Sequence, residues 1–317
     1  MKVIFTCGGT AGHVNPALAL AGYMRKKDPT VEVLFVGTPE GIERDLVTQA
    51  GYDYRGIAVG SLERSVSWEA IRHNCKSAWE MLALRRKTGA ILKEFPADLV
   101  VGTGGYASYP MVKYAALRGI PTAVHEANMI PGLTTKMLEK HASRIMVGFE
   151  ECRALYKHPE RIAVTGTPVR GDFFDLTHEE AKAALGVGKD EPLVVSFWGS
   201  LGASTMNRQM LDFFKKEKED GYPFYHIHAV GGRGWETMQQ EMQKAGLPGS
   251  HKLDVRKYIY DMAVVMRAAD LVICRAGAST ISEITALAVP TIIVPSPYVA
   301  NNHQEKNARI LAQHGGA

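Results

Sequence analysis

Near its start the chain carries a glycine-rich stretch, CGGTAGHVNP (residues 7–16), which follows the first apolar run at residues 3–5. A short apolar run that leads into glycines and then into a helical pattern is typical of a buried parallel strand that turns tightly into a helix. Glycines at such a turn let backbone N–H groups approach an oxygen-rich ligand. The stretch therefore predicts an α/β fold with a ligand-binding turn at the carboxyl end of its first strand.

The same alternation continues along the 317 residues. Short apolar runs predict strands at residues 3–5, 31–36, 99–101, 122–124, 145–147, 162–164, 193–197, 224–229, 271–273 and 291–294. Helical patterns lie between them at residues 16–27, 41–50, 68–92, 206–216, 258–268 and 280–288. This order indicates two Rossmann-like parallel-sheet domains in series, residues 1–166 and 167–317. Ligands bind outside the carboxyl ends of such strands, so we expect the domains to face each other across a cleft that holds the site.

Three glycine-rich turns, at residues 8–12, 102–105 and 199–202, are expected to follow strands. A single turn of this kind is equally compatible with tight strand–helix packing, but three in one chain favour diphosphate or sugar binding. A dinucleotide fingerprint is absent, because Thr10 stands where its second glycine belongs and the second strand ends in Val36-Gly37 without an acidic residue. The sequence also lacks a P-loop, so hydride transfer and P-loop phosphoryl transfer are disfavoured.

Polar residues beside the first turn and at two later helix starts are candidate ligand contacts. His13 lies at a predicted helix N-terminus, where the helix dipole favours a neutral ring, so it is a candidate general base or anion contact as well as a capping residue. Glu283, in CRAGASTISEI, is placed to bind vicinal sugar hydroxyls or to form a capping box with Thr280. In NNHQEKNA, the side chains of His303, Gln304 and Asn307 are suited either to sugar hydroxyls or to capping at the surface.

Charge is unevenly distributed along the chain. Residues 1–166 contain 21 Lys and Arg against 16 Asp and Glu, whereas residues 167–317 contain 16 against 17. The excess favours an anionic partner for the first half. The four cysteines lie far apart, without metal or disulfide spacing. Because an apolar strand is predicted from residue 3, we expect no signal peptide. A D-x-D motif is absent, so we expect no obligatory metal or cofactor, and we expect no nucleic-acid partner.

Residues 68–84 carry an apolar stripe at helical spacing, bordered by basic residues. The stripe consists of Trp68, Ile71, Cys75, Trp79 and Leu82, and the flanking residues are Arg64, Arg72, Lys76, Arg85, Arg86 and Lys87. Such a helix covers a sheet in many proteins. Basic residues beside an apolar stripe also favour a helix that lies on an anionic membrane surface. We predict peripheral, salt-sensitive membrane binding through this segment.

Seven motifs occur in an order that closely resembles the MurG family, the N-acetylglucosaminyltransferases of peptidoglycan synthesis. They are GGTAGHVNPALALA, GTGGYASYP, HEANMIPGLTTK, GTPVR, GSLGAS, CRAGASTISE and HQEKNA. The resemblance runs from residue 2 to the end of the chain. It implies a glycosyltransferase B fold that transfers GlcNAc from UDP-GlcNAc to the 4-hydroxyl of the muramoyl sugar of undecaprenyl-diphospho-muramoylpentapeptide, with inversion. It also implies work at the cytoplasmic face of the cell membrane, with the acceptor on the first domain and the donor on the second.

The resemblance also assigns roles residue by residue. It makes His13 the favoured base. It implies donor contacts for Thr10, Ala11 and Gly12 (sugar and diphosphate), Asn128 and Gln304 (sugar), Arg170, Ser200 (phosphate), Ile259 (uracil), and Ala278, Ser279, Thr280, Ile281, Ser282 and Glu283 (phosphate and ribose). On the acceptor side it implies Tyr106, Ser108, His125 and Glu126.

The sequence departs from the family pattern at several positions. Ala11, Tyr109 and Trp198 stand where glycine is usual, and the chain stops at LAQHGGA where the family continues for a few more helices. We therefore expect the C-terminal end to be missing. Other functions remain open: a transferase of this fold that acts on a diacylglycerol or a small aglycone, a UDP-GlcNAc 2-epimerase, or a module that binds nucleotide sugars without catalysis.

Overall fold

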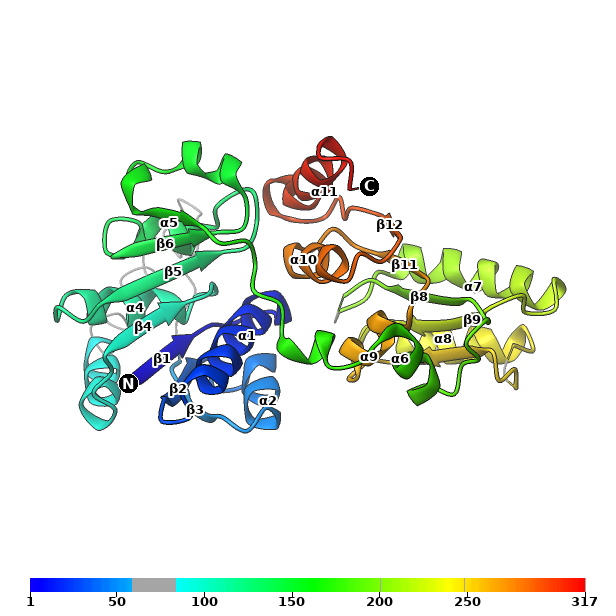
Figure 1. Cartoon of the computed structure of the whole chain (residues 1–317), viewed down its shortest axis with the longest axis horizontal. Helices are drawn as coiled ribbons and strands as arrows, with labels where there is room; N and C mark the ends of the chain where they lie inside the picture. The colour runs from blue at the N-terminus through cyan, green and yellow to red at the C-terminus, as the bar shows by residue number, and fades with distance from the viewer. Residues whose placement is uncertain (59–83, 200, 248, 317) are drawn as a thin grey trace, which may run out of the picture. The chain divides into compact units, whose positions relative to one another are not determined.

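The computed structural model describes residues 1–58, 84–199, 201–247 and 249–316. They form two compact units, Met1–Arg170 and Gly171–Ala317, and each is an α/β unit with its own parallel sheet (Figure 1). The expectation of two Rossmann-like parallel-sheet domains is confirmed.

The sheet of the first unit has seven strands in the order β3-β2-β1-β4-β5-β6-β7, and neighbouring strands run parallel. Six of these strands coincide with predicted apolar runs, while β3 was not predicted. The strands are β1 (Lys2–Thr6), β2 (Glu32–Gly37), β3 (Asp53–Gly56), β4 (Leu99–Gly102), β5 (Thr122–Glu126), β6 (Arg144–Val147) and β7 (Ile162–Val164).

Helices cover both faces of this sheet. Val3 and Phe5 belong to the core beneath α1 and α2, where the rings of Phe5 and Phe35 stack at 5.4 Å, whereas Ile4 belongs to the core beneath α4 and α5. This alternation explains why the strands read as continuous apolar runs. The helices are α1 (Ala11–Lys27), α2 (Ile42–Gln49), a helix at residues 84–94, α4 (Ser108–Ala116) and α5 (Leu133–Leu138), with 3₁₀ turns η1 (Glu150–Leu155) and η2 (Pro159–Arg161).

Two helix predictions need comment. The helix expected from residue 16 begins at Ala11, so Pro16 lies inside α1 rather than at its first position. The helix expected at residues 68–92 is described only from residue 84 onward, where Leu84, Ile91 and Leu92 are buried in the core. The apolar stripe of Trp68, Ile71, Cys75, Trp79 and Leu82 lies outside the described residues, as do Arg64, Arg72 and Lys76.

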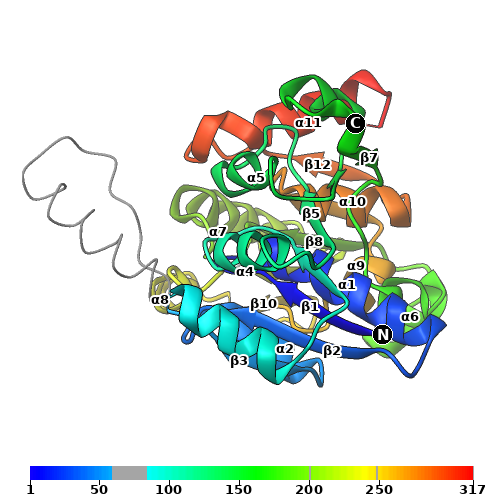
Figure 2. The same cartoon turned by 90° about the vertical axis from the view of Figure 1, so that its left-hand side faces the viewer.

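The second unit repeats the architecture with five strands in the order β10-β9-β8-β11-β12 (Figures 1 and 2). Its strands are β8 (Leu193–Phe197), β9 (Tyr225–Ala229), β10 (Leu253–Arg256), β11 (Leu271–Cys274) and β12 (Thr291–Ile293). Its helices are α6 (His178–Ala184), α7 (Ser204–Glu219), α8 (Trp235–Lys244), α9 (Met262–Ala268), α10 (Ala278–Leu287) and α11 (His303–Gln313), with 3₁₀ turns η3 (Gly171–Phe174) and η4 (Ala300–Asn302).

The strand order reverses once in each sheet, between β1 and β4 in the first unit and between β8 and β11 in the second. In open parallel sheets the crevice at such a reversal is the usual ligand site. The glycine turns after β1, β4 and β8 all leave the sheets at these two places, as does the turn that precedes α10. Among the described helices, none is both long enough and apolar enough to cross a membrane.

Candidate active site

The two glycine turns of the first unit touch each other at the reversal point. A Cβ on Gly104 would overlap the His13 ring, and a Cβ on Gly105 would overlap the backbone of Gly8. Thr103, in the second turn, donates its hydroxyl to the His13 carbonyl at 2.6 Å. Glycine is thus required in the second turn because the first turn lies directly against it.

His13 occupies the first turn of α1, as predicted, three residues after the N-cap Thr10. Its Nδ1 lies 2.8 Å from the Gly8 carbonyl oxygen. A carbonyl only accepts hydrogen bonds, so in the neutral ring Nδ1 carries the hydrogen and Nε2 keeps its lone pair. The half-buried ring therefore presents a proton acceptor. Thr10 and Gly12 are exposed and Ala11 is half-buried at the start of the same helix, which no side chain caps.

Of the predicted acceptor-side residues, Tyr106 and Ser108 follow β4, and His125 and Glu126 are the last two residues of β5. Tyr106 is 66% exposed, whereas Ser108 is fully buried with its hydroxyl 2.7 Å from the carbonyls of Thr6 and Gly104. His125 is also buried, with Nε2 3.1 Å from the Gly166 carbonyl, and burial lowers its pKa. Of these three side chains, Tyr106 is the one that reaches solvent.

Glu126 shapes the loop that carries Asn128. Its carboxylate accepts hydrogen bonds from the Asn128 backbone N–H at 3.1 Å and from the Asn128 amide at 3.3 Å. It also accepts from Gly132 N–H and from the Thr135 hydroxyl, each at 2.8 Å. The carboxylate is buried and turned toward its own loop. Its position indicates that it holds Asn128 in place.

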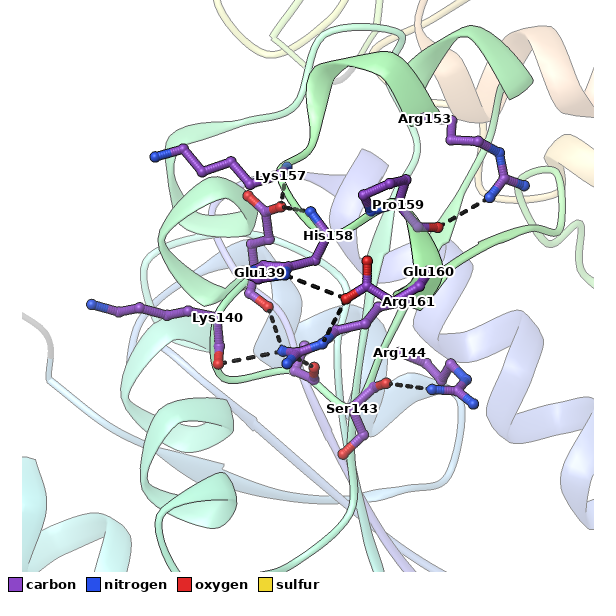
Figure 3. A network of polar contacts seen from close by, with 11 residues as sticks. Glu139, Lys140, Ser143, Arg144, Arg153, Lys157, His158, Pro159, Glu160 and Arg161 are labelled. Carbon is purple, nitrogen blue, oxygen red and sulfur yellow. Dashed lines mark hydrogen bonds and ion pairs between the residues drawn. The ribbon is translucent and has the colours of Figure 1, made fainter.

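A second carboxylate, that of Glu139, holds the segment between η1 and η2 (Figure 3). Glu139 is buried and accepts the backbone N–H groups of Lys157 and His158. Figure 3 shows the side chains of Lys140 and Lys157 extending to the same side, away from this carboxylate. Together with Lys136 and Tyr109 they line a hollow of about 230 Å³, which gives the unit a basic surface.

In the second unit α10 starts at the turn after β11, where the strand order reverses. Gly277 is its N-cap, so Thr280 lies inside the helix and a capping box between Thr280 and Glu283 does not form. Glu283 is only 8% exposed. Ala278 and Ile281 are buried, Ser279 and Thr280 are half-buried, and the Ser282 hydroxyl donates to the Ala278 carbonyl at 3.1 Å.

The remaining predicted donor residues are dispersed. Ile259 is buried between β10 and α9, and the Gln304 side-chain oxygen accepts the Ser296 backbone N–H at 2.8 Å. Arg170, half-buried, ends the first unit. Ser200 lies outside the described residues. Asn307 is fully buried and donates to the Ala276 carbonyl at 3.2 Å, so it supports the turn before α10 rather than capping at the surface.

Arg275 is a residue that sequence reasoning missed. Its guanidinium donates to the carbonyls of Val294 and Pro295, at 3.2 and 3.0 Å, and lies over the Trp198 ring at 5.8 Å from the centroid. It therefore joins the turn after β11 to the ends of β8 and β12. The CRAG motif contained it, but its partners are distant in sequence.

Comparison with known proteins identifies the family of the chain. The N-terminal domain of glycosyltransferase family 28 matches residues 3–147, and its C-terminal domain matches residues 193–317. The chain belongs to glycosyltransferase family 28. It is 43% identical, over all its residues and 84% of the relative, to the UDP-N-acetylglucosamine--N-acetylmuramyl-(pentapeptide) pyrophosphoryl-undecaprenol N-acetylglucosamine transferase of Acetivibrio thermocellus. The transferase of the same name from Thermoanaerobacter sp. is 38% identical over the whole chain and 85% of the relative.

Solved structures of family 28 and of other enzymes share the fold. MurG of Acinetobacter baumannii is similar with a TM-score of 0.66 at 25% identity, covering 99% of this chain and 84% of that one. The UDP-GlcNAc 2-epimerase of Neisseria meningitidis has a TM-score of 0.63 at 11% identity, covering 98% and 85% of the two chains. The second likeness shows the fold alone, which is that of glycosyltransferase B enzymes.

Proposed function

We propose that this family 28 glycosyltransferase moves GlcNAc from UDP-GlcNAc to the 4-hydroxyl of the muramoyl sugar of undecaprenyl-diphospho-muramoylpentapeptide. This reaction is a step of peptidoglycan synthesis. The observation that carries the proposal is the 43% identity, over the whole chain, to a relative whose name states the donor, the acceptor and the group transferred. The positions of His13 and of the turn before α10 support it.

The donor is assigned mainly to the second unit. The start of α10, with Ala278, Ser279 and Thr280, offers backbone N–H groups and a helix dipole to the diphosphate of UDP. Glu283, one turn further, is suited to accept hydrogen bonds from the ribose hydroxyls. Ser200 and Arg170 are assigned to phosphate, Ile259 to uracil, and Gln304, Asn128 and the Thr10–Gly12 stretch to the sugar.

The proposed reaction is a single inverting displacement. The 4-hydroxyl oxygen of the muramoyl sugar attacks C1 of GlcNAc from the face opposite the diphosphate. The bond from C1 to the phosphate oxygen breaks, and UDP leaves with its electron pair. The hydroxyl proton passes to His13 Nε2, whose lone pair is left available by the bond from Nδ1 to Gly8. Such general-base assistance is typically worth about 10²–10⁴-fold in rate.

A polyprenyl-anchored acceptor requires the enzyme to reach a membrane surface. Arg85, Arg86 and Lys87 are exposed on the helix at residues 84–94, and the hollow at Lys136, Lys140 and Lys157 adds further positive charge to the same unit. Each basic residue near an anionic surface contributes about 1 kcal/mol. These charges support peripheral binding to the anionic cytoplasmic face of the cell membrane.

The deciding experiment measures UDP release from UDP-GlcNAc with and without a short-chain muramoyl-pentapeptide diphosphate lipid, and identifies the sugar products. The proposal expects UDP release only with the acceptor, together with a GlcNAc-muramoyl product. An epimerase would change the donor sugar without acceptor, a different transferase would accept another lipid or aglycone, and a binding module would bind donor without turnover. Any of these three outcomes contradicts the proposal.

A further inference from the structure

The side chain of Glu43 is fully buried directly behind the first glycine turn. Glu43 lies in the first turn of α2, and its carboxylate points back toward the turn after β1. A buried carboxylate is costly unless hydrogen-bond donors surround it. The groups around Glu43 are hydrogen-bond donors, which stabilise its ionised carboxylate.

Three donors meet this carboxylate. Oε1 accepts the Thr38 backbone N–H at 2.9 Å and the Thr38 hydroxyl at 2.5 Å, and Oε2 accepts the Gly9 backbone N–H at 3.3 Å. Burial opposes ionisation, but these hydrogen bonds outweigh it, and the pKa of Glu43 lies below its ordinary value. Tyr54 in turn donates to the Thr38 carbonyl at 2.7 Å, which secures the loop that holds Glu43.

Glycines make room for the group. A Cβ on Gly41 would overlap the Glu43 carboxylate, a Cβ on Gly37 would lie 2.8 Å from Glu43 Cγ, and a Cβ on Gly8 would lie 3.1 Å from Oε1. Gly9 itself has φ +86°, a conformation that side chains rarely adopt. Because these positions carry no side chain, the backbone lies directly against the Glu43 carboxylate.

One peptide unit connects Glu43 to His13. The Gly9 N–H that Glu43 accepts and the Gly8 carbonyl that accepts from His13 Nδ1 belong to the same planar amide. Glu43, the 8–9 peptide and His13 thus form a continuous chain of hydrogen bonds. Since the carboxylate only accepts, it also opposes a flip of this peptide, which would direct the Gly8 oxygen at a negative charge.

We propose that Glu43 is a positioning residue that fixes the orientation of the 8–9 peptide and, through it, the tautomer of His13 that has a free Nε2 lone pair. A flipped peptide would present Gly9 N–H to His13 Nδ1, which would place the ring hydrogen on Nε2 and abolish its capacity as a base. The role in transfer rests on the proposed function, whereas the role in setting the tautomer does not.

The test compares Glu43→Gln with the matched control Glu40→Gln, an exposed glutamate in the loop just before α2. Glutamine both accepts and donates, so it tolerates the flipped peptide. We expect the ring ¹⁵N signals of His13, assigned by their loss in His13→Asn, to show Nδ1–H in the wild type and a mixture of tautomers in Glu43→Gln. We expect kcat of Glu43→Gln to fall about tenfold or more with the donor KM little changed, as for a misplaced catalytic group. Glu40→Gln should match the wild type in both measurements.

Two results would overturn the inference. The first is an Nε2–H tautomer of His13 in the wild type, a measurement that does not depend on the folding of any variant. The second is a Glu43→Gln variant whose His13 tautomer and kcat are the same as those of the wild type. Absence of GlcNAc transfer by the wild type would instead contradict the proposed function. The tautomer measurement would remain valid in that case.

Discussion

His226 Nδ1 lies 2.6 Å from the Glu217 carboxylate inside the second unit, and both side chains are almost completely buried. The chain of hydrogen bonds continues from His226 Nε2 to the Ser196 hydroxyl at 2.7 Å, and from there to His228 Nδ1 at 2.6 Å. Although serine, histidine and glutamate also form hydrolytic triads, Ser196 has no exposed surface here, so the group joins β8, β9 and α7 instead of meeting a substrate.

This buried chain predicts acid sensitivity. Burial, and after it the charge of His226, lowers the pKa of His228 from 6.5 to about 3. The unfolded chain therefore binds a proton at pH values where the folded chain does not, and stability is lost as the pH falls below 6.5. The slope reaches about 1.4 kcal/mol per pH unit, or about 2 kcal/mol between pH 7 and pH 5. Urea denaturation should show a smaller loss in His228→Gln, and equal losses in both proteins would contradict the assignment.

Replacing the proposed base should separate catalysis from binding. His13→Ala removes the Nε2 acceptor but leaves the start of α10 and Glu283 intact, so turnover should fall about 10²–10⁴-fold. UDP-GlcNAc affinity, measured by calorimetry, should change little. If affinity falls in step with turnover, His13 binds the donor and the base lies elsewhere.

Glu283→Ala should weaken UDP-GlcNAc binding by about 1.5–3 kcal/mol, the range for a hydrogen bond to a charged group. Because the N-cap of α10 is Gly277, a lost capping box does not complicate this variant. Glu236→Ala, at an exposed position of α8, is the matched control and should bind as the wild type does. Equal donor affinity in all three proteins would remove Glu283 from the donor site.

The proposed membrane-binding surface of the protein can be tested by removing its positive charges. Replacing Arg85, Arg86 and Lys87 by Gln should reduce co-sedimentation with anionic vesicles and leave binding to UDP-GlcNAc unchanged. Wild-type binding should fall as salt rises and should be weak with neutral vesicles. The same replacement at Lys215, Lys216 and Lys218 on α7 serves as the control. Unchanged binding in the first triple variant would move the membrane surface to another part of the unit, with the hollow at Lys136 and Lys140 the next region to test.

Much of the fold could be predicted because most of its strands are buried on both faces. The strands that escaped prediction, β3 and β10, lie at sheet edges and read DYRG and LDVR, so they carry no continuous apolar signal. The start of α1 was placed at Pro16 because proline favours a first helical turn, whereas here it is accommodated within the helix.

Residues of the candidate site could be proposed from the sequence only where they belong to a recognisable motif. His13 was a candidate from the sequence because it lies in a glycine turn. Glu43, in IERDLVTQ, belongs to no motif, and its link to Gly9 arises only once β1 and β2 pair. The acceptor-side role of Glu126 stays a prediction, and the structure adds that its carboxylate accepts hydrogen bonds from its own loop, which the HEAN motif did not indicate. Both carboxylates accept hydrogen bonds from backbone N–H groups, and a sequence does not reveal such partners.

The repeated strand order bears on how the two units evolved. Both units start from the same βαβ plan, and each reverses its strand order after the third strand counted from one edge. Such a pattern is what duplication of an ancestral half followed by divergence would leave behind. It also makes the junction after Arg170 a natural crossover point, where recombination between relatives would exchange one whole unit and preserve the other.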